Sequence, residues 1–359
     1  MISRRHLLAA LAAIPALPLH IFGQDAPAGR GQQRDQPRDV APLVPPFEPT
    51  GWKTVWLDHL NYQCVDYRKA AAFYATLMGW QVRSDDGTQA VLDMGENSGG
   101  IVIRGGMTAP PPAAITDAGL GVSRPKVQAA FDGFAWGIEP WNTDTVKAAL
   151  EKRGLKPVAD HHGDDYRAFR VKDPDGFDVA ITNGTKALRR KTPANAKLPA
   201  PAPFEPTGWR TLYLDHISFE VPDYRRTAAF YQALLGWDVR PGNGTQASAQ
   251  IGSIAGAIIR GNAAARAAAR GNAGGAGAAP APSPSSNAGT AAIGHISFGI
   301  ENWDTERVRA ELKKRDVVYV NREGQREPRP DMTGTLESFH VPDAMGWDLQ
   351  IGNKIAPSR

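Results

Sequence analysis

The sequence has almost no cysteine. Cys64 is the single one among 359 residues, so no disulfide can form within the chain even in an oxidising compartment. A long hydrophobic run is also missing. The apolar segment from Leu7 to Leu19 is interrupted by Pro15 and Pro18, and it is shorter than the roughly 20 residues that cross a bilayer. A stable membrane anchor is therefore not expected.

The regions that are expected to fold lack an excess of basic residues, although the whole chain carries +4 and has a pI near 9.1. Residues 1–46 carry +2 and residues 187–203 carry +4, which leaves about −2 for the rest. No segment resembles a helix-turn-helix or an RNA-binding motif. Nucleic acid is therefore not an expected partner.

Two arginines, Arg4 and Arg5, precede the apolar segment, and this placement resembles a twin-arginine export signal. A general secretory signal is the alternative, because such peptides also begin with basic residues. We expect residues 1–23 to be the export signal and residues 24–46 to be a disordered spacer. The protein is then periplasmic or extracellular, and the twin-arginine resemblance implies that it is exported folded.

The remaining chain is a tandem repeat. The sequence Phe-Glu-Pro-Thr-Gly-Trp occurs at residues 47–52 and again at residues 204–209. We expect a first domain over residues 47–186, a linker over 187–203 and a second domain over 204–354. An Ala/Gly/Pro/Ser-rich insert at residues 262–292 is expected to be a flexible loop of the second domain.

The stretch from Leu214 to Arg240 shows how each copy begins. Its first residues alternate as in a strand, which places Leu214, His216, Ser218 and Glu220 on one face. Asp223 offers an N-cap for an amphipathic helix, and Gly236 ends that helix before another strand begins. A weaker repeat within each copy predicts two units of strand, helix and about three strands, which is an α+β fold.

With these elements, the chain resembles the vicinal oxygen chelate superfamily, which includes glyoxalase I, bleomycin-resistance proteins and extradiol dioxygenases. The resemblance covers residues 47–184 and 204–354 and implies paired βαβββ modules around a metal or ligand cavity. Carried over residue by residue, it implies that His216, His295 and Gln350 bind a divalent metal, with Fe, Mn, Zn or Ni as candidates. The alternative is that both histidines are ordinary core residues.

Residues 339–350 are similar to the extradiol signature but depart from it at three positions. His340 stands in place of the tyrosine, Ala344 in place of the proline and Gln350 in place of the ligand glutamate. The resemblance gives His340 a catalytic role as a donor of a proton or hydrogen bond to substrate. A solvent-facing His340 and a merely hydrogen-bonding Gln350 are the alternatives.

The first copy lacks most of this set. It keeps His59, but Gly133 stands where His295 is and Ala180 where Gln350 is. A lone imidazole does not hold a metal, so we expect this domain to be structural or ligand-binding only. The adjacent His161 and His162 lie in an acidic loop, which favours a solvated turn over a metal site.

Two functions are consistent with these residues. The first is a metal-dependent enzyme that acts on a small substrate with vicinal oxygens, most like extradiol ring cleavage. The second is a non-catalytic ligand-binding protein of the bleomycin-resistance type. Glyoxalase-type isomerisation is less attractive, because it relies on carboxylates that neither copy shows at the ligand positions.

Overall fold

The computed structural model describes residues 41–95, 98–108, 122–123, 125–163, 165–191, 194, 196–242, 244–262 and 291–357. The expected export signal, most of the spacer and most of the insert lie outside these residues. The described residues all belong to one compact unit. Among the described helices, none has both the length and the apolar character that crossing a membrane requires.

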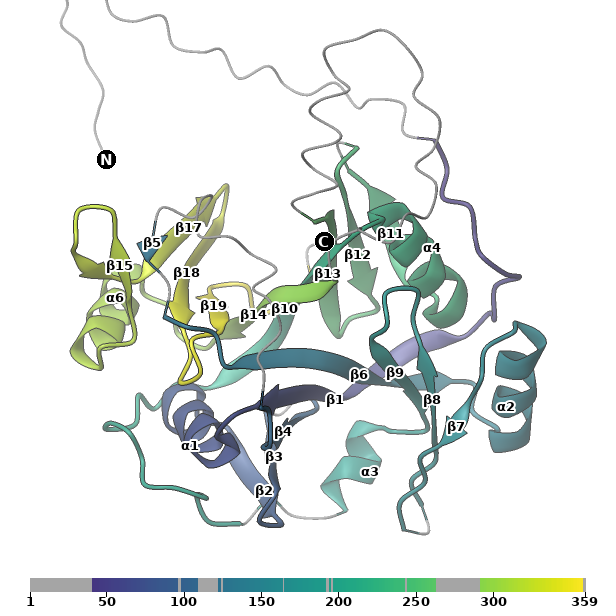
Figure 1. Ribbon diagram of the computed structural model, residues 1–359, viewed down its shortest axis with the longest axis horizontal. Helices are drawn as coiled ribbons and strands as arrows, with labels where there is room; N and C mark the ends of the chain where they lie inside the picture. Colours follow the sequence, from purple (N-terminus) through teal and green to yellow (C-terminus); the bar gives the residue numbers. More distant parts are fainter. Residues whose placement is uncertain are drawn as a thin grey trace, which may run out of the picture. The chain divides into compact units, whose positions relative to one another are not determined.

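The first copy forms an eight-stranded mixed sheet with the order β2-β3-β4-β1-β6-β9-β8-β7 (Figure 1). Its two halves join where β1 pairs antiparallel with β6. The elements are β1 (Lys53–Cys64), α1 (Tyr67–Met78), β2 (Gln81–Asp85), β3 (Gln89–Asp93), β4 (Gly100–Arg104), β6 (Ala129–Glu139), α2 (Thr143–Lys152), β7 (Val158–Ala159), β8 (Ala168–Lys172), β9 (Asp178–Thr182) and α3 (Lys186–Arg190).

The second copy repeats this topology as β11-β12-β13-β10-β14-β19-β18-β17. A small sheet, β16-β15-β5, joins the copies through β5 (Val122–Ser123). The elements of the second copy are β10 (Thr211–Val221), α4 (Tyr224–Leu235), β11 (Asp238–Pro241), β12 (Gln246–Ile251), β13 (Ala255–Gly261), β14 (Ala292–Ile300), α6 (Thr305–Lys314), β15 (Tyr319–Asn321), β16 (Arg326–Glu327), β17 (Arg329–Thr333), β18 (Leu336–Pro342) and β19 (Asp348–Gly352).

The predicted α+β fold of two tandem domains is confirmed, and local sequence explains its helices. The side chain of Asp223 caps α4 by accepting hydrogen bonds from the backbone N–H groups of Arg225 and Arg226. Gly236 ends the helix at φ 66°, a left-handed conformation that glycine adopts without strain. The expected linker, residues 187–203, begins inside helix α3 (Lys186–Arg190).

The two copies pack crosswise, so that the first half of one copy contacts the second half of the other. The Trp80 ring, next to α1, lies 5.1 Å from that of Phe298 on β14, and Trp237, next to α4, lies 5.5 Å from Trp136 on β6. The buried apolar residues of both copies accordingly form one continuous cluster. Burial of this shared apolar surface is the main force that holds the copies together.

One expectation about β10 was wrong. Leu214 does not share a face with His216. The register in which β10 pairs with β14 shifts between these two β10 residues. The shift is a β-bulge, which turns Leu214 into the hydrophobic core beside Ile217. His216 and Ser218 remain on the polar face of the sheet, as expected.

Candidate metal centre

The polar face of the second sheet carries a cluster of buried side chains at its centre. The residues that alternate with these polar side chains along the strands face the hydrophobic core; Ile217, Phe339 and Ile351, for example, are apolar and fully buried. Alternation along four neighbouring strands therefore directs the polar set to one side. The cluster comprises His216 and Ser218 on β10, His295 and Ser297 on β14, Asp348 and Gln350 on β19, and Ser338 and His340 on β18.

His216 and His295 meet directly, with their Nε2 atoms 3.0 Å apart. The Nδ1 of His216 lies 2.9 Å from a carboxylate oxygen of Asp215, and the other oxygen of Asp215 lies 2.6 Å from the Lys354 ammonium. Because a carboxylate only accepts, Nδ1 of His216 donates to Asp215, and Nε2, which faces Nε2 of His295, is the ring atom placed to bind a metal. The sheet pairs Ser218 with His295, which brings the two strands into this register.

The amide of Gln350 has a defined orientation. Ser338 Oγ donates to the backbone oxygen of Asp331 at 3.0 Å, so it must accept the 2.8 Å hydrogen bond from Gln350 Nε2. The Oε1 atom of Gln350 therefore faces away from Ser338, and it is buried without a hydrogen-bond partner among the described residues. A neutral oxygen ligand is thus available on the strand next to His295.

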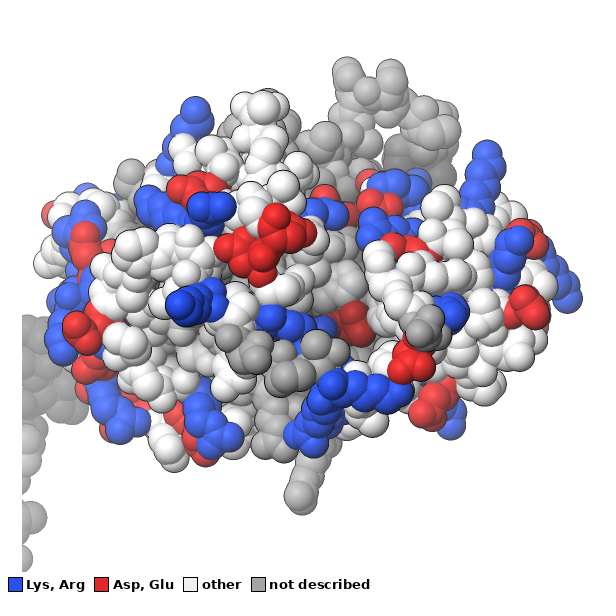
Figure 2. All heavy atoms as spheres, turned by 90° about the horizontal axis from the view of Figure 1, so that it is seen from below, with Lys and Arg blue, Asp and Glu red and all other residues white. Residues whose placement is uncertain are grey.

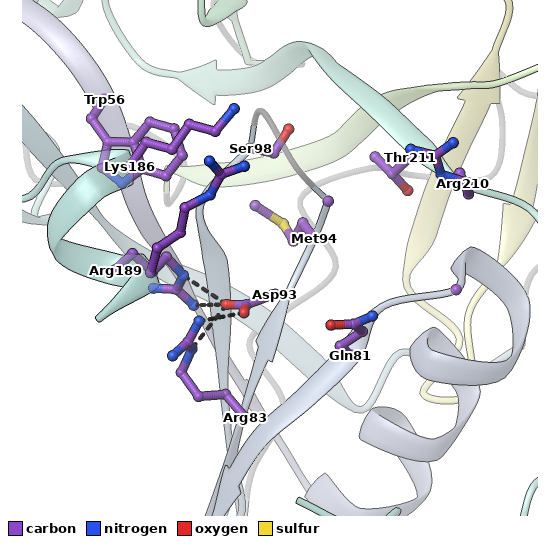
Figure 3. A pocket seen from close by; sticks show the side chains of 13 residues that line it. Trp56, Gln81, Arg83, Asp93, Met94, Ser98, Lys186, Arg189, Arg210 and Thr211 are labelled. Carbon is purple, nitrogen blue, oxygen red and sulfur yellow. Dashed lines mark hydrogen bonds and ion pairs between the residues drawn. The ribbon is translucent and has the colours of Figure 1, made fainter. Parts of the chain in front are cut away.

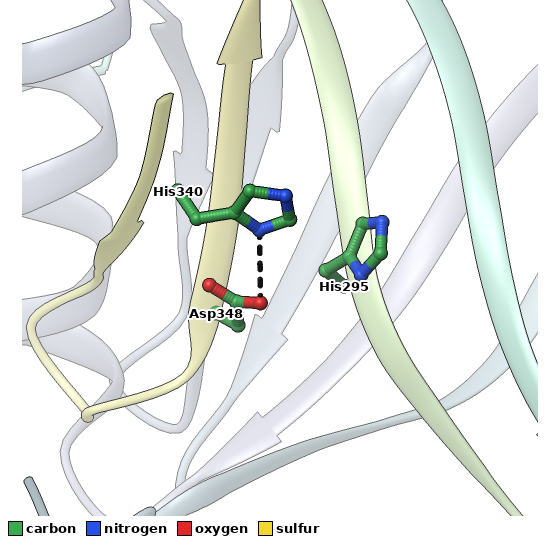
Figure 4. Close-up of side chains that lie close together, drawn as sticks. All are labelled: His295, His340 and Asp348. Carbon is green, nitrogen blue, oxygen red and sulfur yellow. Dashed lines mark hydrogen bonds and ion pairs between the residues drawn. The ribbon is translucent and has the colours of Figure 1, made fainter. Parts of the chain in front are cut away.

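His340 lies beside His295, as Figure 4 shows. Its ring centroid is 4.8 Å from that of His295, and its Nδ1 donates to a carboxylate oxygen of Asp348 at 3.0 Å. Tyr319 donates to the other Asp348 oxygen at 2.8 Å. His340 is 2% exposed, which excludes the alternative of a solvent-facing strand residue.

The electrostatics of the cluster keep His295 available as a ligand. Burial lowers the pKa of His295 well below its ordinary value, and the charges of His340 and His216 add to the effect. Burial opposes ionisation of Asp215, but the hydrogen bond and charge of His216 and the Lys354 ammonium lower its pKa overall. His295 is therefore neutral, as a metal ligand must be, beside an ionised Asp215.

Two further hydroxyls in the cluster have unsatisfied hydrogen-bonding capacity. Ser218 Oγ and Ser297 Oγ are buried and, within the described part of the chain, have no partner. Buried polar atoms are normally paired, so orphaned atoms around a histidine pair indicate a bound group. Ser297 pairs in register with both His216 and Gln350, which places it between two of the predicted ligands.

The ligand set fits a metal ion. Two nitrogens that bind one metal at about 2.1 Å lie about 3 Å apart, and the Nε2 atoms of His216 and His295 have this separation. A second combination of donor atoms overlaps with the predicted one: ligand atoms of His295, His340 and Asp348 all lie within 4.8 Å of one another. Both combinations share His295.

A cavity of about 650 Å³ opens beside His216. Its wall includes Arg240, Ile258 and Leu336 and ends at Asp215 and Lys354. The volume lies within the usual range for small-molecule sites. Gly256 borders the same cavity, and a Cβ there would lie 2.5 Å from the backbone oxygen of Asp215, so only glycine fits.

At the corresponding place in the first copy, the described residues do not supply the same ligands. His59 keeps its carboxylate partner Asp58 at 2.6 Å. Gly133 faces Asn61 just as His295 faces Ser218, but a Cβ at Gly133 would lie 2.5 Å from the backbone oxygen of Asp178. Arg170 occupies the register position of His340 and bonds to Asp160 instead. His59 is thus without the partners that His216 has.

Among the described residues, the histidine pair in the acidic loop, His161 and His162, belongs to no group of side chains that could hold a metal. His162 is 70% exposed at its side chain and contacts Asp160, whereas His161 accepts a hydrogen bond from the backbone of Ala168. The sequence analysis overlooked Asp215, Asp348 and Lys354. Two signals pointed to the aspartates: the Leu-Asp-His sequence occurs in both copies, and Asp348 precedes Gln350 by the two-residue period of a strand.

The family model described as Glyoxalase/Bleomycin resistance protein/Dioxygenase superfamily matches residues 56–181 and 213–351. No curated protein matches the chain.

Solved structures are similar to this chain at low sequence identity. The Mn(II)-bound glyoxalase from Novosphingobium aromaticivorans is 14% identical with a TM-score of 0.54, and the match covers 84% of this chain and 82% of the other. A variant of homoprotocatechuate 2,3-dioxygenase from B. fuscum is 17% identical with a TM-score of 0.52, covering 87% and 74%. An extradiol ring-cleaving dioxygenase from B. fuscum is 16% identical with a TM-score of 0.51, covering 87% and 74%. At these identities the likeness extends to the fold alone.

Proposed function

Because the chain belongs to the Glyoxalase/Bleomycin resistance protein/Dioxygenase superfamily, we propose that its second copy is a metal-dependent enzyme. Its substrate is a small molecule with vicinal oxygens, and the reaction is most like extradiol ring-cleaving dioxygenation. The observation that carries the proposal is the His216–His295 pair, with Nε2 atoms 3.0 Å apart and the unpaired Gln350 oxygen on the adjacent strand.

His216, His295 and Gln350 would hold the divalent metal. Asp215 orients His216 through Nδ1, as carboxylates commonly orient metal-binding histidines. The bound metal would supply a Lewis acid with positions open to two adjacent substrate oxygens. With neutral ligands only, it would keep its full positive charge, so a substrate that brings negative charge on its oxygens is favoured.

His340 is the residue proposed to handle protons. Its Nδ1 hydrogen is engaged by Asp348, and its Nε2 lies 3.8 Å from a carboxylate oxygen of Asp331. In the proposed reaction, Nε2 would accept a proton from a substrate hydroxyl and return it later. Asp348 would stabilise the charged imidazole during that step. The substrate would enter from the cavity beside His216, where Leu336 and Ile258 offer apolar contacts.

A ligand-binding protein of the bleomycin-resistance type is the second candidate, and Gln350 favours it. An amide oxygen attracts a cation less strongly than the carboxylate that extradiol enzymes have at this position. Glyoxalase-type isomerisation remains less attractive, because it would need a carboxylate at the position of Gln350.

The first test is the metal content of the purified mature protein. We expect about one divalent ion per chain in the wild type and loss of that ion in His216→Ala and His295→Ala. His59→Ala is the matched control, because His59 has the same carboxylate contact but no second histidine. Equal loss of metal from all three variants would contradict the assignment to the second copy.

The second test separates the enzyme from the binding protein. Metal-loaded protein is mixed with catechol-type compounds, and oxygen uptake and ligand binding are followed together. The enzyme consumes oxygen and loses activity in His340→Ala while still binding the catechol. Binding without oxygen uptake by the wild type would favour the second candidate.

A further inference from the structure

The first copy fills its own counterpart of the cavity that is open in the second copy. Gly100 corresponds to Gly256, which borders that cavity. A Cβ at Gly100 would overlap the guanidinium of Arg189 on helix α3. Arg189 donates to the backbone oxygen of Asp58 at 3.2 Å and to the carboxylate of Asp93 at 2.7 Å, the second of which Figure 3 shows. A side chain of the first copy thus takes the space that a ligand has in the second.

The surface of the molecule does not indicate a charged partner for the first copy either. On the face seen in Figure 2, the acidic and basic side chains of the described residues are interspersed, so a field of one sign does not build up there. By contrast, one segment of the first copy contacts the second copy next to the residues that hold His340.

This segment, called the strap here, consists of residues 122–123 and 125–128. Its first part is β5, which pairs antiparallel with β15 of the second copy. In its last part, the backbone N–H of Gln128 donates to the backbone oxygen of Met345 at 2.8 Å. The strap is therefore bonded to two separate elements of the second copy, β15 and the turn between β18 and β19.

The turn between β18 and β19 fits closely against the first copy. Gly346 has a φ of 75°, and a Cβ there would lie 2.7 Å from the backbone oxygen of Lys126 in the strap. The ring of Trp347 lies 4.5 Å from that of Phe131 on β6. Asp348 follows directly as the first residue of β19. The first copy therefore fixes the point at which the strand of Asp348 begins.

Tyr319 links the other contact of the strap to the same aspartate. Tyr319 lies on β15, is 1% exposed, and donates its hydroxyl hydrogen to Oδ1 of Asp348 at 2.8 Å. The other oxygen, Oδ2, accepts from Nδ1 of His340 at 3.0 Å and lies 3.9 Å from the guanidinium of Arg329. Because Tyr319 holds one oxygen, the carboxylate cannot rotate freely, and the position at which the other oxygen meets His340 is fixed.

The first copy does not have this arrangement among its described residues. Asp178 corresponds to Asp348, but its side chain is 36% exposed instead of 1%, and it pairs with the ammonium of Lys172 at 2.9 Å. Arg170 stands at the register position of His340. The buried series of tyrosine, aspartate and histidine therefore belongs to the copy that carries the proposed metal centre.

We propose that Tyr319 is a positioning residue for His340 and that the first copy sets the position of both through the strap. This rests on the proton-transfer role that the proposed function gives to His340. Tyr319 acts through Asp348 and does not touch the substrate. The first copy, which lacks the ligand set, then contributes to the reaction by holding the residues that orient the proton-transfer histidine.

The test is the Nδ1–H proton of His340, observed by NMR in the full mature chain labelled with 15N-histidine and freed of metal by a chelator. Its signal is the one that is missing from His340→Gln. In the wild type we expect slow exchange with water, because the donor is buried and bonded to Asp348. In Tyr319→Phe, exchange should be at least about tenfold faster, the factor that corresponds to losing a hydrogen bond to a buried carboxylate.

Tyr231→Phe is the matched control. It removes a similarly buried hydrogen bond, from the Tyr231 hydroxyl to Asp173 at 2.9 Å, at a place remote in sequence from His340. It should leave exchange of the His340 proton unchanged. Unchanged exchange in Tyr319→Phe, or the same acceleration in both variants, would overturn the proposal.

Gly346→Ala tests the contribution of the strap. The added Cβ must displace Lys126, so exchange of the His340 proton should again accelerate. Gly176→Ala is the control, because Gly176 is the corresponding glycine of the first copy, has a φ of 97°, and leaves nothing within 4 Å of a new Cβ. Phe131→Leu tests the same contact without backbone strain. If both Gly346→Ala and Phe131→Leu leave the exchange unchanged, the first copy does not position His340, and the proposal is wrong.

These measurements need neither metal nor turnover, so they are separate from the tests of the proposed reaction. Faster exchange in Tyr319→Phe, combined with a wild type that takes up no oxygen, would support the positioning and contradict the reaction. Where the wild type does take up oxygen, Tyr319→Phe should lower kcat and leave KM unchanged, because His340 acts after the substrate is bound. An unchanged kcat would contradict the link between this positioning and catalysis.

Discussion

At the scale of single residues, the proposed role of Gln350 as a metal ligand can be tested by substitution. Its amide nitrogen is held by Ser338, and its oxygen is left buried and unpaired. Gln350→Glu keeps the length of the side chain and adds an anionic oxygen. We expect metal affinity to rise by about tenfold or more, because a carboxylate attracts a cation more strongly than an amide in a buried site.

Metal titration by calorimetry measures this effect, with and without a catechol-type ligand. In the wild type, the metal and an anionic chelator should bind with positive cooperativity. This cooperativity should be smaller in Gln350→Glu, because the glutamate already supplies negative charge to the metal. Unchanged metal affinity in the variant would mean that Gln350 is not a ligand.

Asp173 provides a pH-dependent prediction away from the metal centre. Burial, with the charge of Asp175, raises its pKa from 3.8 to about 6. The folded chain therefore binds this proton more tightly than the unfolded chain, and its stability falls as the pH rises between those two values. The full difference corresponds to about 3 kcal/mol above pH 6.

Asp173→Asn should remove this pH dependence. Its oxygen can still accept from the backbone N–H groups of Asp175 and Phe177, and Tyr231 can accept from its amide. Relative to the wild type, the variant should gain stability in urea unfolding on going from pH 4.5 to pH 7.5. An identical stability difference at both pH values would contradict the raised pKa.

At the scale of elements, the ends of α1 and α4 determine how closely the copies approach. Gly79 and Gly236 have φ values of 69° and 66°, and a Cβ at either would lie 2.2 Å from a backbone oxygen of the other copy, that of Trp209 or Trp52. Each glycine is therefore required twice, once for the helix end and once for the contact between copies.

Gly79→Ala and Gly236→Ala should both be strongly destabilising. Gly51→Ala and Gly208→Ala are the controls, since they have φ values of 76° and 72° but nothing within 4 Å of the new Cβ. All four share a left-handed strain of about 1–2 kcal/mol. The first pair should lose about 1–3 kcal/mol more, because the copies must shift apart. Equal losses in chemical denaturation would argue against the close contact.

At the scale of the whole molecule, buried aspartates are held by tyrosines of the opposite copy. Asp343 accepts hydrogen bonds from the hydroxyls of Tyr62 and Tyr74. Asp173 accepts one from Tyr231 at 2.9 Å, and Phe219 stands where the second tyrosine would be. The two copies are thus joined by tyrosine–aspartate hydrogen bonds in both directions, with two tyrosines on Asp343 and one on Asp173.

Tyr231→Phe should therefore cost more than Tyr62→Phe. The first leaves Asp173 with no side-chain donor in the described part of the chain, for which we expect a loss of about 1–3 kcal/mol. The second leaves Tyr74 on Asp343, and we expect a loss of about 1 kcal/mol or less. Urea unfolding at pH 7.5 compares them, and a larger loss for Tyr62→Phe would contradict this account.

Export is also a property of the whole chain, and we propose the twin-arginine route. Changing both Arg4 and Arg5 to lysine should leave unprocessed protein in the cytoplasm, because that signal depends on the arginine pair. Cell fractionation with an antibody against the second domain measures it. Normal export of the variant would favour the general secretory route.

The sequence by itself determined the tandem repeat, the limits of helix α4 and the strands that carry His216, His295 and Gln350. Such features follow from local rules, namely caps, glycine ends and two-residue alternation, each of which is encoded within a few neighbouring residues. Only the tertiary structure decided that the two Nε2 atoms meet at 3.0 Å, that Ser338 turns the Gln350 amide, and that the bulge removes Leu214 from the polar face. It likewise decided the crosswise packing, because contacts between residues more than 100 positions apart depend on how the sheets associate and have no local signal.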